Sequence, residues 1–339
     1  MPELSAFRRA VERSWYAPRP PLLLRPLAGL YGIGMDLRRL AYRARLLPSS
    51  HAGIPTIVVG NLSVGGTGKT PLVLWLAGRL RTLGRRPGIV LRGYGGAARA
   101  PRLVQGGDDA ALVGDEAVLL ARRTGCAVAV GAHRAQAAAL LVRAGCNILI
   151  ADDGLQHLAL RRDLAIIVVD GARGFGNGAL LPAGPLRERA SRLRAGDCVV
   201  LHGEDRRGVL PPGIAPFRMQ LEALPLRQLP THAECGRDAL GDGRVHAVAG
   251  IGNPQRFFAQ LRAMGLDPVE HTFADHHRFR ASELAFGDGR PIVMTEKDAV
   301  RCAGLAAGRR DLFYLPVAAV LPEADATRLI DRVLAIGRD

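Results

Sequence analysis

The sequence predicts an α/β fold with a doubly wound, mostly parallel β-sheet. Short runs of Val, Ile and Leu recur at the length of buried strands, and stretches of helical length lie between them. Several of the runs end in Gly, Asn or Asp. Strands that alternate with helices in this way are typical of a parallel sheet with helices on both faces.

The expected elements follow this alternation along the chain. The first strand is residues 55–61, and the next helix is residues 71–80, with Pro71 in its first turn. A strand at residues 89–95 and a helix at residues 117–123 come next. The remaining strands of this sheet are expected at residues 147–153, 164–170 and 198–201.

A glycine-rich loop joins the first strand to its helix. Strand, glycine loop and helix in this order predict a P-loop, in which backbone N–H groups and the helix N-terminus hold nucleotide phosphates. The usual first glycine of the motif is Ser63, while Gly65 and Gly66 keep the loop permissive. The residues expected to bind ATP are Ser63, Val64, Gly65, Gly66, Thr67, Gly68, Lys69 and Thr70.

Lys69 is one of only two lysines, the other being Lys297, whereas 44 of the 46 basic Lys and Arg residues are arginine. Where positive charge alone suffices, this chain uses Arg. A retained Lys therefore indicates a place that needs a compact ammonium, such as contact with the β- and γ-phosphates. The sequence predicts an ATP-dependent phosphotransferase in which the Thr70 hydroxyl binds Mg²⁺.

Polar side chains follow the strand at residues 147–153. Asp152 and Asp153 close the apolar run, and Gln156 and His157 come directly afterwards. Ligands bind at the carboxyl ends of strands in open α/β sheets, so one of the two aspartates is expected to hold Mg²⁺. The alternative is a turn in which both aspartates cap backbone groups.

Two further motifs, one acidic and one containing histidines, are candidates for a catalytic role. Asp115 opens a helix, where it is either a helix N-cap or a base that accepts the proton of an acceptor hydroxyl. His276 and His277 follow Asp275 far downstream. Without a spaced carboxylate they fit a metal site poorly, and a His that positions or shares a proton with the base fits better.

Composition narrows the functional classes. The formal net charge of +15 predicts an anionic partner such as nucleic acid, anionic lipid or a phosphorylated substrate, although a genome that favours Arg is an alternative. The five cysteines are scattered, which argues for a reducing cytosol and against a disulfide framework or zinc cluster. We find no signal peptide and no apolar run of about 18 residues that would span a membrane.

Residues 1–50 combine leucines with nine arginines. The apolar positions fit one helical face, so the segment is expected to form a basic amphipathic helix at an anionic membrane surface. The alternative is a helix packed on the main domain with a solvated basic face. The arginines are Arg8, Arg9, Arg13, Arg19, Arg25, Arg38, Arg39, Arg43 and Arg45, and the expected apolar face is Leu27, Leu30, Tyr31, Leu37, Ala41 and Ala44.

Together these motifs resemble the tetraacyldisaccharide 4′-kinase family, the lipid A kinase of Gram-negative bacteria. The resemblance runs from about residue 20 to about residue 300. It rests on the order of these stretches: residues 59–61 with 63–71, 92–95, 114–116, 152–157, 181–188, 249–254, 275–277 and 295–300. Gly96 stands where the family pattern leads us to expect a basic residue, which puts one side-chain contact in doubt.

The resemblance implies the acceptor, the 4′-hydroxyl of tetraacyldisaccharide 1-phosphate, and a peripheral enzyme on the cytoplasmic face of the bacterial inner membrane. It implies an anionic membrane surface as partner, no nucleic acid and no obligate protein partner. Asp115 would be the catalytic base with His276 as its partner, beside Lys69 and Arg187. The implied metal group is Thr70, Asp152, Asp153 and Glu188, and the implied acceptor contacts are Arg92, Tyr94, Glu116, Gln156 and His157.

The family also has a second, smaller α/β lobe on a two-stranded connector. We therefore expect a membrane-associating segment, a P-loop core, a Pro-rich connector and a smaller lobe whose last helix packs back on the core. The expected bounds are residues 1–50, 51–209, 210–230 and 231–339. The site would lie between the lobes, and closure would bring in His276.

Two other classes of protein remain as alternatives. A P-loop GTPase or metallochaperone would need [NT]-K-x-D, but in residues 295–298 the Lys comes one position late. A partition-type ATPase would need Lys where Val64 stands. A nucleic-acid-binding ATPase is favoured by the net charge but lacks a basic motif interleaved with aromatic residues.

Overall fold

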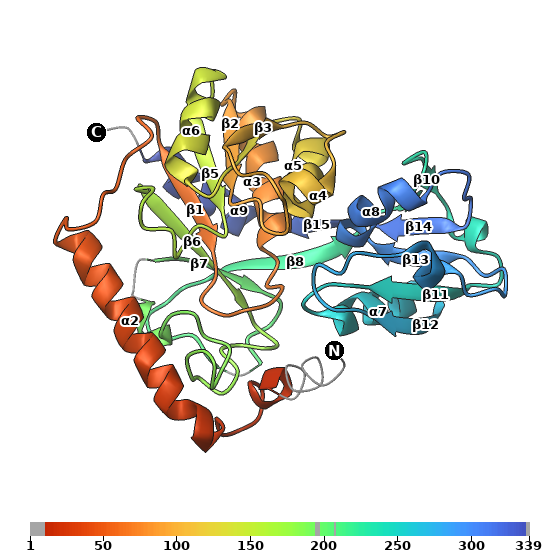
Figure 1. Cartoon of the computed structure of the whole chain (residues 1–339), viewed down its shortest axis with the longest axis horizontal. Helices are drawn as coiled ribbons and strands as arrows, with labels where there is room; N and C mark the ends of the chain where they lie inside the picture. Colours follow the sequence, from red (N-terminus) through yellow and green to blue (C-terminus); the bar gives the residue numbers. More distant parts are fainter. Residues whose placement is uncertain (1–10, 194–196, 207, 337–339) are drawn as a thin grey trace.

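The computed structural model describes residues 11–193, 197–206 and 208–336, and it contains two β-sheets that lie side by side (Figure 1). Arg8 and Arg9 of the expected basic segment lie outside the described residues. The predicted α/β fold class is confirmed, because parallel strands joined through helices form most of both sheets.

The larger sheet has nine strands in the order β15-β8-β7-β6-β1-β5-β2-β4-β3. Neighbouring strands from β8 to β4 are parallel, and the two edge strands β15 and β3 are antiparallel to their neighbours. The bounds are β1 Thr56–Gly60, β2 Pro87–Leu91, β3 Arg102–Val104, β4 Ala127–Val130, β5 Ile148–Asp152, β6 Leu164–Asp170, β7 Cys198–His202, β8 Phe217–Ala223 and β15 Val317–Val320.

Both faces of this sheet are buried, as the unbroken apolar strands require. Ile57 and Val59 face one core together with α3, α5 and α9, whereas Val58 faces a second core together with α6. Irregular chain between β6 and β7 completes the second core. The helices of this unit are α3 Lys69–Thr82, α4 Ala110–Val113, α5 Asp115–Thr124, α6 Arg134–Arg143 and α9 Glu323–Leu334.

The expected strand at residues 89–95 is shorter than predicted. Strand β2 ends at Leu91, and Gly93 and Gly95 both have φ +76°, a left-handed conformation that strands do not adopt. Residues 92–95 therefore form a loop beyond the carboxyl end of β2, which is the edge of the sheet where ligands bind.

The smaller sheet has six strands in the order β10-β9-β14-β13-β11-β12, of which β11 to β14 are parallel. Its apolar side chains form two further cores. The bounds are β9 Leu226–Gln228, β10 Glu234–Cys235, β11 Arg244–Ala249, β12 Asp267–Thr272, β13 Ile292–Thr295 and β14 Leu312–Leu315, with helices α7 Pro254–Ala263 and α8 Glu296–Cys302.

Two antiparallel strands of the larger sheet carry the chain between the two units. Strand β8 leads out towards β9, and β15 leads back from β14 (Figure 1). The outward passage between Ala223 and Leu226 falls inside the predicted connector. Strand β15 was assigned to the smaller lobe by the sequence but pairs with β8, and Leu329 and Val333 of α9 pack in the core of the larger sheet.

Helix α2, Arg25–Arg43, runs along the outside of the larger unit, at the lower left of Figure 1. Ala28 and Gly32 form its buried side, where a Cβ on Gly32 would lie 2.8 Å from Leu180 Cδ1. A stripe of apolar side chains on α2 is at least half exposed, namely Leu27, Leu30, Ile33, Leu37 and Leu40, and Leu23 of the preceding 3₁₀ turn Leu22–Leu24 is exposed as well. Tyr31 differs from the expected apolar face, because its hydroxyl donates to the Arg187 carbonyl at 3.1 Å.

Candidate active site

The glycine-rich loop lies between β1 and α3, as its sequence context predicts. Gly65 and Gly68 have φ values of +107° and +97°, so the loop needs glycine at these two positions. The Asn61 side-chain amide donates to the Thr67 hydroxyl at 3.2 Å, which fixes the loop against the end of β1. Helix α3 begins at Lys69, so its free N–H groups point into the loop.

Lys69, Asp153 and Arg187 form a charged group beside the loop. The Lys69 ammonium lies 3.4 Å from the Asp153 carboxylate, and Arg187 donates to both oxygens of that carboxylate at 2.9 Å. Burial alone would raise the pKa of Asp153, but the charges of Lys69 and Arg187 outweigh it and hold the pKa far below its ordinary value. The carboxylate thus keeps Lys69 and Arg187 close to where phosphates would bind.

Asp152 closes strand β5 at this edge of the sheet. It is 2% exposed, and both its carboxylate oxygens are buried without a partner among the described residues. Burial and then the charge of Glu116 raise the pKa of Asp152 to about 7. A buried carboxylate that lacks a partner fits a cation, and oxygen ligands are those that Mg²⁺ prefers. Within the described part of the chain no three His, Cys, Asp or Glu side chains converge, so phosphates would have to complete such a site.

Glu188, which the resemblance implied as a metal ligand, has other partners. Its buried carboxylate is bound by Arg39 of α2, by Arg192 at 3.0 Å, and by the Gln156 amide at 2.6 Å. Through Arg39, the Glu188 carboxylate ties α2 to the site. Its role as a metal ligand stays a prediction, as for Asp153, which also pairs with two cationic side chains.

A second cluster of charged side chains lies where the two units meet. Asp115, at the start of α5 and 3% exposed, lies 3.1 Å from His276 Nδ1, and its other oxygen accepts from the Glu116 backbone N–H at 2.9 Å. His276 has φ +60° and comes from the smaller unit, where its backbone N–H donates to the Gly250 carbonyl at 3.2 Å. Figure 1 places the α5 end of the larger unit next to α8 of the smaller one.

Arg301 holds this pair and was missed by the sequence analysis. Its Nε donates to Asp115 at 2.7 Å, and its Nη1 donates to Asp298 at 2.8 Å and to the Gly250 carbonyl at 2.9 Å. Burial would raise the pKa of Asp115, but the hydrogen bond from His276 and the charge of Arg301 lower it far below its ordinary value. The same hydrogen bond raises the pKa of His276. The sequence does not indicate the contact of Arg301 with Asp115, because the two residues are distant in the chain.

Glu116 links the two groups. It forms an ion pair with Lys297, the second lysine, at the beginning of α8. Burial raises the pKa of Glu116, but the charge of Lys297 and, to a smaller degree, that of Lys69 lower it below its ordinary value. Burial and the charge of Glu116 raise the pKa of Asp152. Glu116 follows Asp115 in the chain, so its ion pair with Lys297 lies beside the Asp115–His276 pair.

The remaining expected acceptor contacts surround this site. Tyr94 is exposed and packs on His276 with 4.9 Å between ring centroids. Arg92 is exposed on the same loop. His157 has a pKa lowered to about 4 by burial and by the charge of Arg134, so it is neutral at physiological pH. Arg134 was not predicted; it is buried and donates to the Asp153 carbonyl at 3.0 Å.

The smaller unit also touches the P-loop directly. A Cβ on Gly252 would lie 2.8 Å from the Gly66 backbone nitrogen, and the Gly252 carbonyl accepts from Arg173 at 3.2 Å. Arg256 of α7 reaches Asp170 at 2.8 Å. The loop of residues 250–254 therefore covers one side of the nucleotide site. It can lie this close to the P-loop only because residue 252 is a glycine.

We expect Gly252→Ala to lower kcat/KM for ATP on the order of 10- to 100-fold, because the added methyl group pushes the covering loop off the P-loop. Gly304→Ala is the matched control, since nothing lies within 4 Å of a Cβ at that position of the same unit. Steady-state kinetics of both variants, with melting temperatures, check the prediction. Equal kinetics for the two variants would show that the contact is unimportant.

Comparisons with known proteins agree with this geometry. A family model described as tetraacyldisaccharide-1-P 4′-kinase, LpxK, matches residues 21–335. The chain belongs to the tetraacyldisaccharide 4′-kinase family. A tetraacyldisaccharide 4′-kinase from Alkalilimnicola ehrlichii is 51% identical over 97% of this chain and 96% of the relative. One from Nitrosococcus oceani is 46% identical over 96% of this chain and 95% of the relative.

A solved structure of the same family shares the fold. The LpxK of Aquifex aeolicus, described as an apo form in complex with ATP, superposes with a TM-score of 0.76 at 29% identity. The match covers 91% of this chain and 98% of that chain. Membership of the tetraacyldisaccharide 4′-kinase family confirms the resemblance drawn from the motifs and the prediction of a kinase, and it sets aside the GTPase and nucleic-acid alternatives.

Proposed function

We propose that this chain transfers the γ-phosphate of ATP to the 4′-hydroxyl of tetraacyldisaccharide 1-phosphate, a step in lipid A biosynthesis. The observation that carries the proposal is one site that holds a P-loop lysine, an unpartnered buried aspartate and the Asp115–His276 pair. The names of the family and of its relatives support the acceptor, and the ATP complex of the A. aeolicus relative supports the donor.

Transfer of labelled phosphate in detergent micelles tests this function. We expect label from γ-labelled ATP to appear in the lipid fraction when tetraacyldisaccharide 1-phosphate is present. No labelled lipid should appear when this acceptor is omitted. If the protein binds ATP but labels no lipid, the acceptor assignment fails while the nucleotide site stands.

Phosphate transfer in this site would depend mainly on charge and position. The loop N–H groups would hold the phosphates, and Lys69 would reach the β- and γ-phosphates. Arg187, now paired with Asp153, lies where it can stabilise charge on the transferred group. The Thr70 hydroxyl with Asp152, or Asp153, would hold Mg²⁺, which when bound neutralises charge on the β- and γ-phosphate oxygens.

The Asp115–His276 pair would take the proton of the acceptor hydroxyl. Asp115 Oδ2 already accepts from His276 and Arg301, and its pKa is strongly lowered, so the carboxylate is a weak base by itself. His276 has a raised pKa and, with Nδ1 turned to Asp115, leaves Nε2 to accept a proton. We therefore place the proton on His276, with Asp115 orienting the ring and stabilising the imidazolium.

This assignment predicts how activity depends on pH. His276 must be neutral to accept a proton, so kcat/KM rises with pH through a pKa above the ordinary value of about 6.5. The hydrogen bond and the charge of Asp115 raise the His276 pKa, and the positive charge of Arg301 lowers it to a smaller degree. Arg301→Met should therefore move the acid limb of the pH–kcat/KM profile to higher pH, and Arg301→Lys should restore part of the shift. A limb that stays in place or moves to lower pH would contradict the assignment.

We also propose that the enzyme works at the cytoplasmic face of the inner membrane as a peripheral protein. No helix in the described ranges has both the length and the apolar character to cross a bilayer. The exposed leucine stripe of α2 instead suits the plane of the interface, while Tyr31 and Arg38 of α2 donate hydrogen bonds to the carbonyls of Arg187 and Gln156.

Replacing Leu27, Leu30 and Leu37 together by Ser should weaken binding to anionic lipid vesicles at least tenfold, because each leucine would lose apolar burial of about 1.5 kcal/mol or more. The melting temperature should stay unchanged, since all three side chains are exposed. Vesicle flotation measures the binding. The control variant carries Leu83→Ser and Leu103→Ser, two substitutions at exposed positions outside α2. Equal loss of binding in the control would refute a role specific to α2.

A further inference from the structure

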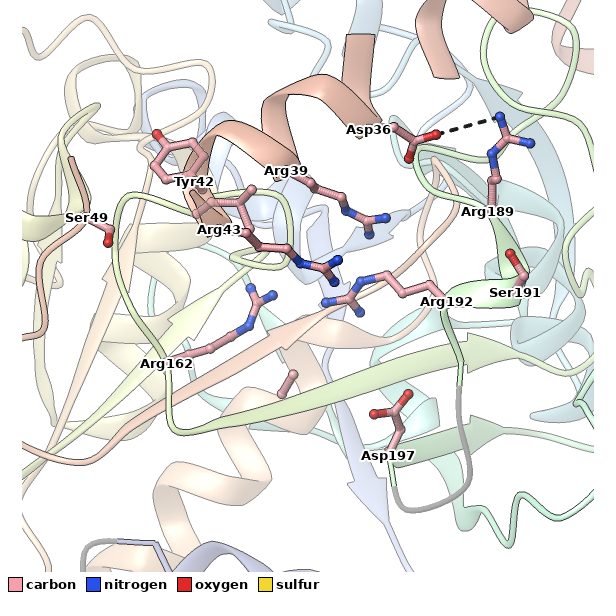
Figure 2. A pocket seen from close by; sticks show the side chains of 12 residues that line it. Asp36, Arg39, Tyr42, Arg43, Ser49, Arg162, Arg189, Ser191, Arg192 and Asp197 are labelled. Carbon is pink, nitrogen blue, oxygen red and sulfur yellow. Dashed lines mark ion pairs between the residues drawn. The ribbon is translucent and has the colours of Figure 1, made fainter. Parts of the chain in front are cut away.

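A cavity of about 650 Å³ lies between α2 and the larger unit, outside the phosphate-transfer site (Figure 2). Five arginine side chains from three segments of the chain line it: Arg39, Arg43, Arg162, Arg189 and Arg192. None of Lys69, Asp115, Asp152 or His276 is among its lining residues. Its size is typical of sites that hold small ligands.

The positive charge in this cavity is only partly neutralised. Arg39 and Arg192 share the carboxylate of Glu188, and Arg189 lies 3.9 Å from Asp36. Asp197 also lies in the wall. Five arginines thus face three carboxylates, which leaves an excess of positive charge for an anion.

Two of the five arginines have no carboxylate within ion-pair distance among the described residues. Arg162 donates to the Leu155 carbonyl at 2.9 Å, and its other donors remain for a ligand. Burial lowers the pKa of Arg162 to about 10, and the charges of Arg192 and Arg39 contribute to this effect. Arg43 approaches from α2, and Figure 2 shows both guanidinium groups directed towards the same space as Arg192. Clustered guanidinium groups are typical of phosphate recognition.

Helix α2 also restricts what kind of anion would occupy the cavity. The helix contributes Arg39, Tyr42 and Arg43 to the cavity and Leu37 and Leu40 to the exposed apolar stripe. If the stripe lies in the interfacial plane, the cavity lies at the depth of the lipid headgroups. A ligand with a phosphate in the cavity and an apolar tail beside the leucines satisfies both surfaces.

We propose that this cavity binds the phosphate headgroup of an anionic membrane phospholipid, separately from the acceptor lipid. The inference rests on the proposed membrane location but not on the kinase reaction. It assigns α2 two functions: apolar contact with the bilayer through its leucines, and recognition of one lipid headgroup through its arginines and those of the facing loops.

Vesicle binding without ATP or acceptor tests the proposal. Three phosphatidylcholine vesicles are compared: one plain, one with phosphatidylglycerol, and one with oleate at the same surface charge but without an anionic phosphate. We expect binding to phosphatidylglycerol vesicles to be about tenfold tighter than to oleate vesicles. Arg162→Gln and Arg43→Gln should abolish this preference. The control, Arg25→Gln, changes an exposed arginine of the same helix outside the cavity. It should weaken binding to both kinds of anionic vesicle by up to about fivefold, as expected for a surface charge.

Several outcomes would overturn the proposal. Equal effects of Arg162→Gln and Arg25→Gln on both anionic vesicles would mean diffuse surface attraction. If millimolar inorganic phosphate raises the melting temperature of the wild type but not of Arg162→Gln, and Arg162→Gln leaves binding to all vesicles unchanged, the ligand is free phosphate. If Arg162→Gln weakens acceptor binding and leaves the phosphatidylglycerol preference intact, the cavity belongs to the acceptor. Kinase turnover in detergent and the melting temperature check that each variant is folded, and loss of the kinase assignment itself would leave these binding results unaffected.

Discussion

Asp115→Asn is expected to lower kcat/KM for phosphate transfer about 1000-fold, with ATP binding nearly unchanged. Asparagine keeps the shape of the side chain but removes the charge that stabilises protonated His276 and pairs with Arg301. The described hydrogen-bond partners of Asp115 are the Glu116 backbone N–H, His276 and Arg301, and none of them belongs to the phosphate loop, so nucleotide affinity should be retained. Single-turnover transfer and ATP titration of the same preparation separate the two effects.

The histidines beside each other at residues 276 and 277 provide a matched control. His276→Gln should lose nearly as much activity as Asp115→Asn, and the double variant should lose little more, because the two residues act as a unit. His277 pairs with Glu283 on the other side, so His277→Gln should retain turnover. Additive losses in the double variant would argue against a shared proton.

Lys69→Arg should lower kcat about 100-fold although the charge is preserved. The ammonium of Lys69 is confined between the loop and Asp153, where a planar guanidinium has a different shape and reach. In a chain that uses Arg at 44 of 46 basic positions, this substitution tests whether the lysine is required as such. Turnover at saturating ATP measures the effect.

Lys69→Met provides the comparison for this prediction. If the shape of the ammonium matters, the Arg and Met variants should both be strongly impaired. If Lys69→Arg retains more than half of wild-type turnover, charge alone suffices, and the retention of lysine needs another explanation.

Much of the larger sheet could be predicted because local signals determine it. Residues 164–170 are strand β6 with both bounds as predicted, and β1 and α3 enclose the glycine loop as expected. The strand at residues 89–95 was predicted too long because Gly93 and Gly95 were counted in it. Strand β15 was placed in the wrong unit, because pairing with β8 depends on partners distant in the sequence.

In the candidate site, too, the residues marked by local motifs could be predicted, and contacts between distant residues could not. Lys69, Asp152 and Asp153 follow from motifs at the ends of strands, whereas the pairing of Asp115 with His276 rested on the family resemblance. The contact of Arg301 with Asp115 could not be predicted, because these two residues are more than 180 positions apart in the chain. Glu188 stands next to Arg187 in the chain, and its carboxylate is bound by Arg39 and Arg192, two contacts that the motif does not indicate.

The most direct measurement is the position of the new phosphate on the lipid product. The purified enzyme would be incubated with ATP, Mg²⁺ and tetraacyldisaccharide 1-phosphate, and the product examined by phosphorus and proton NMR. We expect a bisphosphorylated disaccharide with the new ester at the 4′-oxygen, and no product from an acceptor that lacks the 4′-hydroxyl. A phosphate at another position, or transfer to the 4′-deoxy acceptor, would contradict the proposed function.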